Sequence, residues 1–194
     1  MRSLCRYGAA LALALFACAS SFATEATDIV EKYAAAIRIQ NFAVAAGFVK
    51  PKDLADFKNA FMPIYAAEQK EGVRGFLDAT FGEKAKPEEA TGAEPAVFFE
   101  RVMRFVVNLS DIQGKHLDVV DTKVLGEVAE GLSIVHVVVR NELKLGTNRS
   151  SRVEVISAEK EGGAWRVLLP EKLRMMGNMM EHQLAMRKLV TPAN

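Results

Sequence analysis

The chain has 194 residues, half of them hydrophobic, with 25 basic and 24 acidic side chains. Because the two charges nearly balance, the chain has no excess of positive charge to bind the phosphates of a nucleic acid, and we expect no nucleic-acid partner. A chain of this length can instead bury an ordinary hydrophobic core.

The first 23 residues have the features of a secretory signal peptide. Arg2 and Arg6 precede an apolar run from Ala9 to Ala17, and Ser21-Phe22-Ala23 places small residues at the two positions that a signal peptidase reads. The run is shorter than the roughly 20 apolar residues that a membrane span needs. We therefore predict a cleaved signal peptide over residues 1–23 and export to the bacterial periplasm.

A lipoprotein signal is the alternative, because the stretch from Leu15 to Cys18 resembles a lipobox in which Cys18 becomes the lipidated N-terminus. The bulky Phe16 argues against it. Cleavage after residue 23 would remove both cysteines and leave 23 basic against 24 acidic residues. The mature chain would then hold no disulfide, no thiolate ligand and no long apolar run, so we expect no membrane span in it.

The remaining residues, 24–194, are predicted to form a single α+β domain. The nine phenylalanines of this part lie between Phe42 and Phe105, and its longest β-branched runs follow His116. Helices followed by strands indicate an α+β layout rather than alternating units. We predict a helical half over 24–110, an antiparallel sheet over 115–170 and a C-terminal helix over 171–190.

The first predicted helix begins near Thr27-Asp28 and continues to Phe48, with Val30, Tyr33, Ile37, Val44 and Phe48 at helical spacing. A second helix opens at Pro51, and Pro63 should kink or end it.

A third, short helix is predicted from Val73 to Phe81, where Gly82 stops it. Residues 82–95 are predicted to be a polar loop. Pro95 then begins a helix with Phe98, Val102, Phe105 and Leu109 on one face.

Four strands are predicted, over residues 117–131, 132–146, 151–160 and 164–169, with glycine turns suited to hairpins between them. The second strand is apolar on both alternating faces, which is typical of a strand covered on both sides. We expect the helices to cover one side and the C-terminal helix or a partner subunit to cover the other.

The meander carries a resemblance to a known superfamily. Helices that lead into VLGEVAEGLSIVHVVVRNEL and then RVEVISAEKEGGAWRVLLP, with Trp165 in the closing strand, resemble the nuclear transport factor 2-like superfamily over about Asp28 to Pro170. The resemblance implies a cone whose sheet wraps a long helix around an apolar pocket. The superfamily includes isomerases, dehydratases and lipid carriers. The long helical half and the extra C-terminal helix depart from the common pattern, which argues against the transfer of an enzyme activity.

The sequence lacks the Gly-x-Ser-x-Gly, His-Glu-x-x-His and glycine-rich phosphate-loop motifs, which disfavours nucleophilic hydrolases and zinc hydrolases. An acid/base enzyme of the isomerase or dehydratase type would use His136 with Asp118, and Arg140 shares a strand face with His136. The preferred interpretation is structural: His136 is a half-buried strand residue with one hydrogen bond, and Arg140 pairs with a neighbouring carboxylate.

The function that we predict is a non-catalytic binding or carrier module for a lipid or small apolar molecule, without a cofactor. Its pocket would lie between the phenylalanine-rich helices and the concave face of the sheet. The predicted lining is Tyr33, Ile37, Phe61, Phe98, Phe105, Val137 and Trp165. For Trp165 we favour a core position with its N–H bonded to a carbonyl over a ligand-stacking wall.

The C-terminal stretch RMMGNMMEHQLAM holds five methionines and a histidine. On one helix over Leu173 to Leu189, Leu173, Met176, Met180 and Leu184 form one face, and Met175, Met179, His182 and Met186 form another. Met175, Met179 and His182 could hold Cu(I). The favoured hypothesis is a contact surface that closes the pocket, forms a homodimer or docks an envelope partner. Gly177 indicates a close approach or a hinge.

Overall fold

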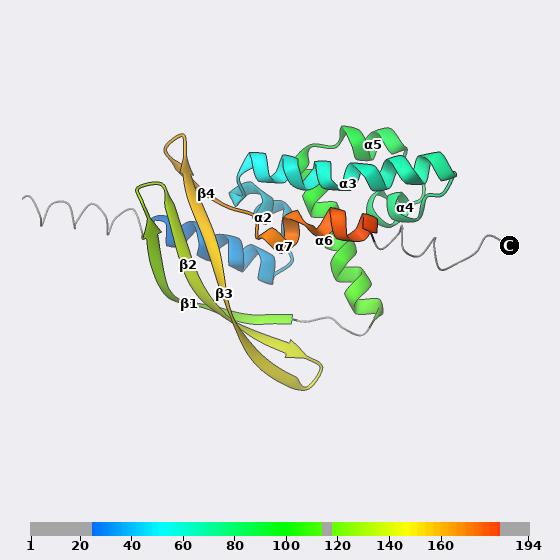
Figure 1. The fold of residues 1–194 in the computed structure, drawn as a ribbon. Helices are drawn as coiled ribbons and strands as arrows, with labels where there is room; N and C mark the ends of the chain where they lie inside the picture. Colours follow the sequence, from blue (N-terminus) through cyan, green and yellow to red (C-terminus); the bar gives the residue numbers. More distant parts are fainter. Residues whose placement is uncertain (1–24, 114–117, 183–194) are drawn as a thin grey trace, which may run out of the picture.

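The computed structural model describes residues 25–113 and 118–182 and has an α+β fold (Figure 1). Helices come first, a curled antiparallel sheet with strand order β1-β2-β3-β4 follows, and short helical segments close the described chain. The predicted fold class is therefore confirmed. The predicted signal peptide lies outside the described residues. Within residues 25–113 and 118–182, no helix is both long and apolar enough to cross a membrane.

Residues 25–38 are helical, and a separate helix, α2, covers Phe42–Phe48. The prediction of one helix that starts at Thr27-Asp28 and ends at Phe48 was wrong at its start and in its middle. The chain is already helical at residue 25, and it breaks at Gln40, whose φ of 56° is left-handed. The side chain of Asn41 then caps α2 by accepting a hydrogen bond from the Val44 N–H at 3.3 Å.

Helix α3 covers Pro51–Glu71, with Pro51 in its first turn as predicted, and α4 covers Gly75–Phe81 and stops at Gly82. The helix α3 does not end at Pro63. Phe61 and Ile64 on either side of the proline are almost fully buried, and we attribute the uninterrupted helix to this burial, which outweighs one missing backbone hydrogen bond.

Part of the predicted loop over residues 82–95 is helical, because α5 covers Pro87–Gly92. The Glu89 carboxylate accepts a hydrogen bond from the Lys86 N–H at 3.0 Å, which is half of a capping box that the polar composition concealed. Helix α6 covers Pro95–Ile112 and begins at Pro95 as predicted.

Aromatic rings from α3, α4 and α6 form the centre of the helical half. Phe57 and Phe61 lie with their ring centroids 5.0 Å apart, and Phe61 stacks on Phe76 at 5.6 Å. Phe98 of α6 contacts both Phe57 and Phe61 and has no exposed surface. This cluster joins three helices into one core.

The sheet consists of β1 (Asp118–Glu130), β2 (Ile134–Leu145), β3 (Asn148–Glu161) and β4 (Ala164–Val167), joined by hairpins at the predicted glycine turns. Val135, Val137 and Val139 of β2 are buried toward the helices. On the outer face, Val153 and Val155 are each 55% exposed. The described C-terminal segment does not cover this face, since it packs against α3. Cover by a partner subunit stays a prediction.

The end of the sheet is joined to the start of α3. Val49 forms a parallel bridge with Val167, and the Lys50 N–H donates to the Val167 carbonyl at 2.9 Å. Two residues later, the Leu169 N–H donates to the buried Asp53 carboxylate at 2.9 Å. Lys50 also pairs with Glu159 of β3 at 2.5 Å. These contacts determine where the chain leaves the sheet.

The C-terminal segment consists of α7 (Glu171–Arg174), a turn at Met175 and helical residues 176–182. The predicted uninterrupted helix from Leu173 is therefore broken at Met175. Met176 and Met180 pack against the core, as the predicted inward face required. Gly177 is buried, and a Cβ atom built on it would lie 2.4 Å from the Ala60 carbonyl oxygen of α3. The close approach predicted at Gly177 is confirmed.

We predict that Gly177→Ala destabilises the protein by about 1–3 kcal/mol, because the added methyl group must push the C-terminal segment away from backbone atoms of α3. The matched control is Gly47→Ala in α2, where a Cβ would have no neighbour within 4 Å. That change should be neutral or stabilising by up to about 1 kcal/mol. Urea unfolding measures both, and equal effects of the two substitutions would contradict the packing at Gly177.

Candidate functional site

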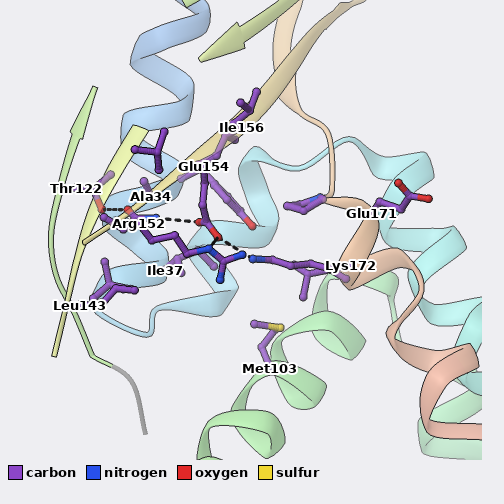
Figure 2. A pocket seen from close by; sticks show the side chains of 17 residues that line it. Ala34, Ile37, Met103, Thr122, Leu143, Arg152, Glu154, Ile156, Glu171 and Lys172 are labelled. Atoms are coloured by element: carbon purple, nitrogen blue, oxygen red, sulfur yellow. Dashed lines mark hydrogen bonds and ion pairs between the residues drawn. The ribbon is translucent and has the colours of Figure 1, made fainter. Parts of the chain in front are cut away.

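A cavity of about 570 Å³ lies between the helix of residues 25–38, the inner face of the sheet, α6 and the start of α7 (Figure 2). Its apolar lining includes Ala34, Ile37, Met103, Val119, Leu143, Ile156 and Leu173. The volume lies within the range of about 300–1,000 Å³ that is usual for small-molecule sites.

Two periodicities direct these side chains into the cavity. Tyr33, Ala34 and Ile37 share one face of their helix, which lies along the sheet. Asn141 and Leu143 continue the inward face of β2 that begins with its buried valines. Toward the end of the strand, where the core thins, the inward positions become half-buried and line the cavity instead.

Polar side chains form a row across three strands at one end of the cavity. The register places Thr122 of β1 opposite Asn141 of β2, and Asn141 opposite Arg152 of β3. The Thr122 hydroxyl donates to Asn141 Oδ1 at 2.8 Å, and Asn141 Nδ2 donates to Glu154 Oε2 at 2.9 Å. Because a carboxylate can only accept, it requires the amide nitrogen to face it, which leaves the amide oxygen for Thr122.

Glu154 is the centre of this polar end. Besides Asn141, its Oε1 atom lies 3.2 Å from Arg152 Nε and 2.9 Å from Lys172 Nζ of α7 (Figure 2). The Glu154 side chain is 25% exposed, and a carboxylate removed this far from water requires such partners. Lys172 and Glu154 therefore connect the C-terminal segment to the sheet at the rim of the cavity.

Tyr33 lies in the wall of the cavity and is only 5% exposed. Burial raises the pKa of the Tyr33 phenol well above its ordinary value, and the negative charge of Glu154 raises it further. The phenol therefore remains neutral at physiological pH.

The predicted lining residues separate into two groups. Tyr33 and Ile37 line the cavity. The other five belong to the core beside it: Phe61, Phe98 and Val137 have no exposed surface, Trp165 is buried and Phe105 packs against the core. None of these five lines the cavity, and their predicted role in ligand binding stays a prediction.

The polar residues Asn141, Arg152, Glu154 and Lys172 were not predicted as site residues. Strand alternation could have found two of them. With Ala158 and Ile156 directed inward, residues 154 and 152 of the same strand must face inward as well. No local pattern indicates Lys172, which reaches the site through the tertiary fold.

Trp165 occupies the predicted core position, and the Lys160 ammonium lies 5.8 Å from the centre of its ring. The described residues do not supply the carbonyl that was expected to accept a hydrogen bond from its ring N–H. Among residues 25–113 and 118–182, the buried Nε1 atom has no partner.

His136 lies on the face of the sheet opposite to Val135 and Val137. Its Nδ1 atom is 2.8 Å from the Ser157 hydroxyl and its Nε2 atom is 2.8 Å from Glu130 Oε2. Asp118 is paired with Lys144, whereas His136 is paired with Val128, so these two catalytic candidates lie near opposite ends of the β1–β2 ladder. Arg140 is exposed and lies opposite Lys123. None of the three candidates lines the cavity.

The methionine-rich segment presents Met175 and Met179 to solvent, at 45% and 49% exposure, and His182 is exposed beside them. Leu173 lines the cavity but Met175 and Met179 do not. The described residues contain no metal-type cluster of three or more His, Cys, Asp or Glu side chains. The Cu(I) hypothesis and the partner-contact hypothesis both stay predictions, and Leu184 and Met186 lie outside the described residues.

No protein-family model, curated protein or solved structure matched this chain.

We predict opposite behaviour for neighbouring methionines. Met176→Glu should lower the free energy of unfolding by about 2–3 kcal/mol, because it places a charge where the side chain packs on the core. Met175→Glu should change it by less than about 0.5 kcal/mol in the monomer. Thermal unfolding at low protein concentration measures both, and equal destabilisation would contradict the orientation of the segment.

The buried phenol of Tyr33 predicts a loss of stability in alkali. Folding raises the pKa of the Tyr33 phenol, so the neutral phenol favours the folded state below about pH 10. This contribution to the free energy of unfolding is lost as the pH rises toward the higher pKa of the folded state. Tyr33→Phe should therefore reduce the fall in unfolding free energy between about pH 9 and pH 11 by about 1 kcal/mol. Identical falls in the wild type and the variant would contradict the assigned burial.

Proposed function

We propose that this protein is a non-catalytic binding or carrier module that holds a lipid or another small apolar molecule in the cavity beside the helix of residues 25–38. The observation that carries the proposal is the mainly aliphatic lining of a cavity of about 570 Å³, formed by Ile37, Met103, Leu143 and Leu173 from four different elements. Apolar walls around an open volume favour an apolar ligand because both surfaces leave water on binding.

Two further expectations belong to this proposal. The predicted signal peptide supports a role in the periplasm, where a carrier would shield an apolar molecule from water. The sheet curled around a helix agrees with the cone that the nuclear transport factor 2-like resemblance implies, and we propose membership in that superfamily (Figure 1).

The test uses an uncharged probe. Dodecanol should bind to the purified protein and raise its melting temperature, and native mass spectrometry of protein from the periplasm should show a bound apolar molecule. Leu143→Trp, which fills the cavity, should weaken dodecanol binding at least about tenfold. Leu145→Trp on the same strand, outside the lining, is the control. Absence of both dodecanol binding and a copurified molecule would reject the carrier function.

A further inference from the structure

Positive charges outnumber negative charges at one side of the cavity rim. Arg152 and Lys172 both contact the single carboxylate of Glu154. Glu171 is the other acidic side chain of the lining, and its carboxylate points away from this group (Figure 2). Two cations that share one anion retain a net positive charge between them.

The two cations also have hydrogen-bond donors to spare. A guanidinium carries five N–H groups and an ammonium three. Among the described residues, Arg152 is engaged through Nε and Lys172 through one contact, both to Glu154. The Arg152 and Lys172 side chains are 59% and 57% exposed, so their remaining donors are accessible at the mouth of the cavity.

Apolar walls begin directly beside these donors. Ile37, Leu143 and Met103 lie on the side of the cavity below the Arg152–Glu154 pair in Figure 2. A ligand that extends from the cations into this space therefore needs an anionic end and an apolar chain.

From these observations we propose that the site binds a single-chain anionic amphiphile, with its carboxylate or phosphate head on the remaining donors of Arg152 and Lys172 and its acyl chain in the cavity. Glu154 acts as a positioning residue, because it holds both cations at the rim and is itself held by Asn141. The proposal rests on the proposed binding function and specifies its ligand class. An anion adjacent to the two cations forms ion pairs as well as hydrogen bonds with them, whereas a neutral alcohol of the same length can accept only the hydrogen bonds.

The experiment compares dodecanoate, dodecyl phosphate and dodecanol by calorimetry with the purified protein. Wild type should bind both anions at least about fivefold more tightly than dodecanol. In Arg152→Gln and in Lys172→Gln, the ratio of anion affinity to dodecanol affinity should fall about fivefold. The affinity for dodecanol should not change. Lys172→Arg, which retains the charge, should retain the preference.

The controls are Arg140→Gln and Lys123→Gln, which remove the same charge from exposed positions that do not line the cavity. They should leave the anion preference intact, which separates a local head-group contact from the net charge of the protein.

Four results would overturn the inference. If dodecanol binds as tightly as dodecanoate, or if the rim variants behave like the controls, the head-group site is rejected while the apolar carrier function stands. If acetate or inorganic phosphate binds as tightly as the amphiphiles, the site recognises a simple anion. If no dodecyl probe binds, the head-group site is rejected, and if no apolar molecule copurifies either, the proposed function is rejected with it.

Discussion

The contact between the end of the sheet and the start of α3 is the constraint on which the rest of this structure depends. The parallel bridge from Val49 to Val167 and the hydrogen bond from Leu169 to Asp53 join segments more than a hundred residues apart. Asp53 lies in the first turn of α3, where the helix dipole favours a negative charge, and the same buried carboxylate holds the chain that leaves β4. Because α7 follows directly after this junction, the junction also determines the position of α7 at the cavity.

The cavity lies beside the helix of residues 25–38, and Phe57, Phe61 and Phe98 of the aromatic core do not line it. Where β2 lies against the helices, Val137 and Val139 are buried and no space remains. Farther along the same strand, Asn141 and Leu143 have the same orientation but only partial cover. The polar row from Thr122 to Glu154 lies at this transition, where water is close enough to tolerate charge and the apolar walls are close enough to receive a chain.

The two faces of the sheet differ in what covers them. The inner face carries the core and the cavity, while the outer face exposes Val153 and Val155 beside the hydrogen-bonded His136. Because β2 is apolar on both faces, we expect both faces of the sheet to be covered. The described residues, 25–113 and 118–182, cover only the inner face. The acid/base candidates His136, Asp118 and Arg140 do not line the cavity.

Much of the fold could be predicted because its signals are local. Pro51 and Pro95 begin helices, Gly82 ends one, and glycine turns delimit the four strands, since each of these residues restricts its own backbone. The helix break at Gln40 and the short helix α5 were missed, because the first requires an unfavourable left-handed residue and the second lies in a segment of polar composition.

The sequence by itself determined the α+β class, the order of the strands and the inward face of the C-terminal segment, because periodicity is a property of neighbouring residues. Only the tertiary structure decided which inward residues became core and which became cavity wall. Phe61 and Phe98 have the same apolar pattern as Ile37, yet ring packing buries them completely. Arg152 and Glu154 share a face of β3 through strand alternation, but their meeting with Lys172 depends on the junction at Asp53, a long-range contact that no local pattern encodes.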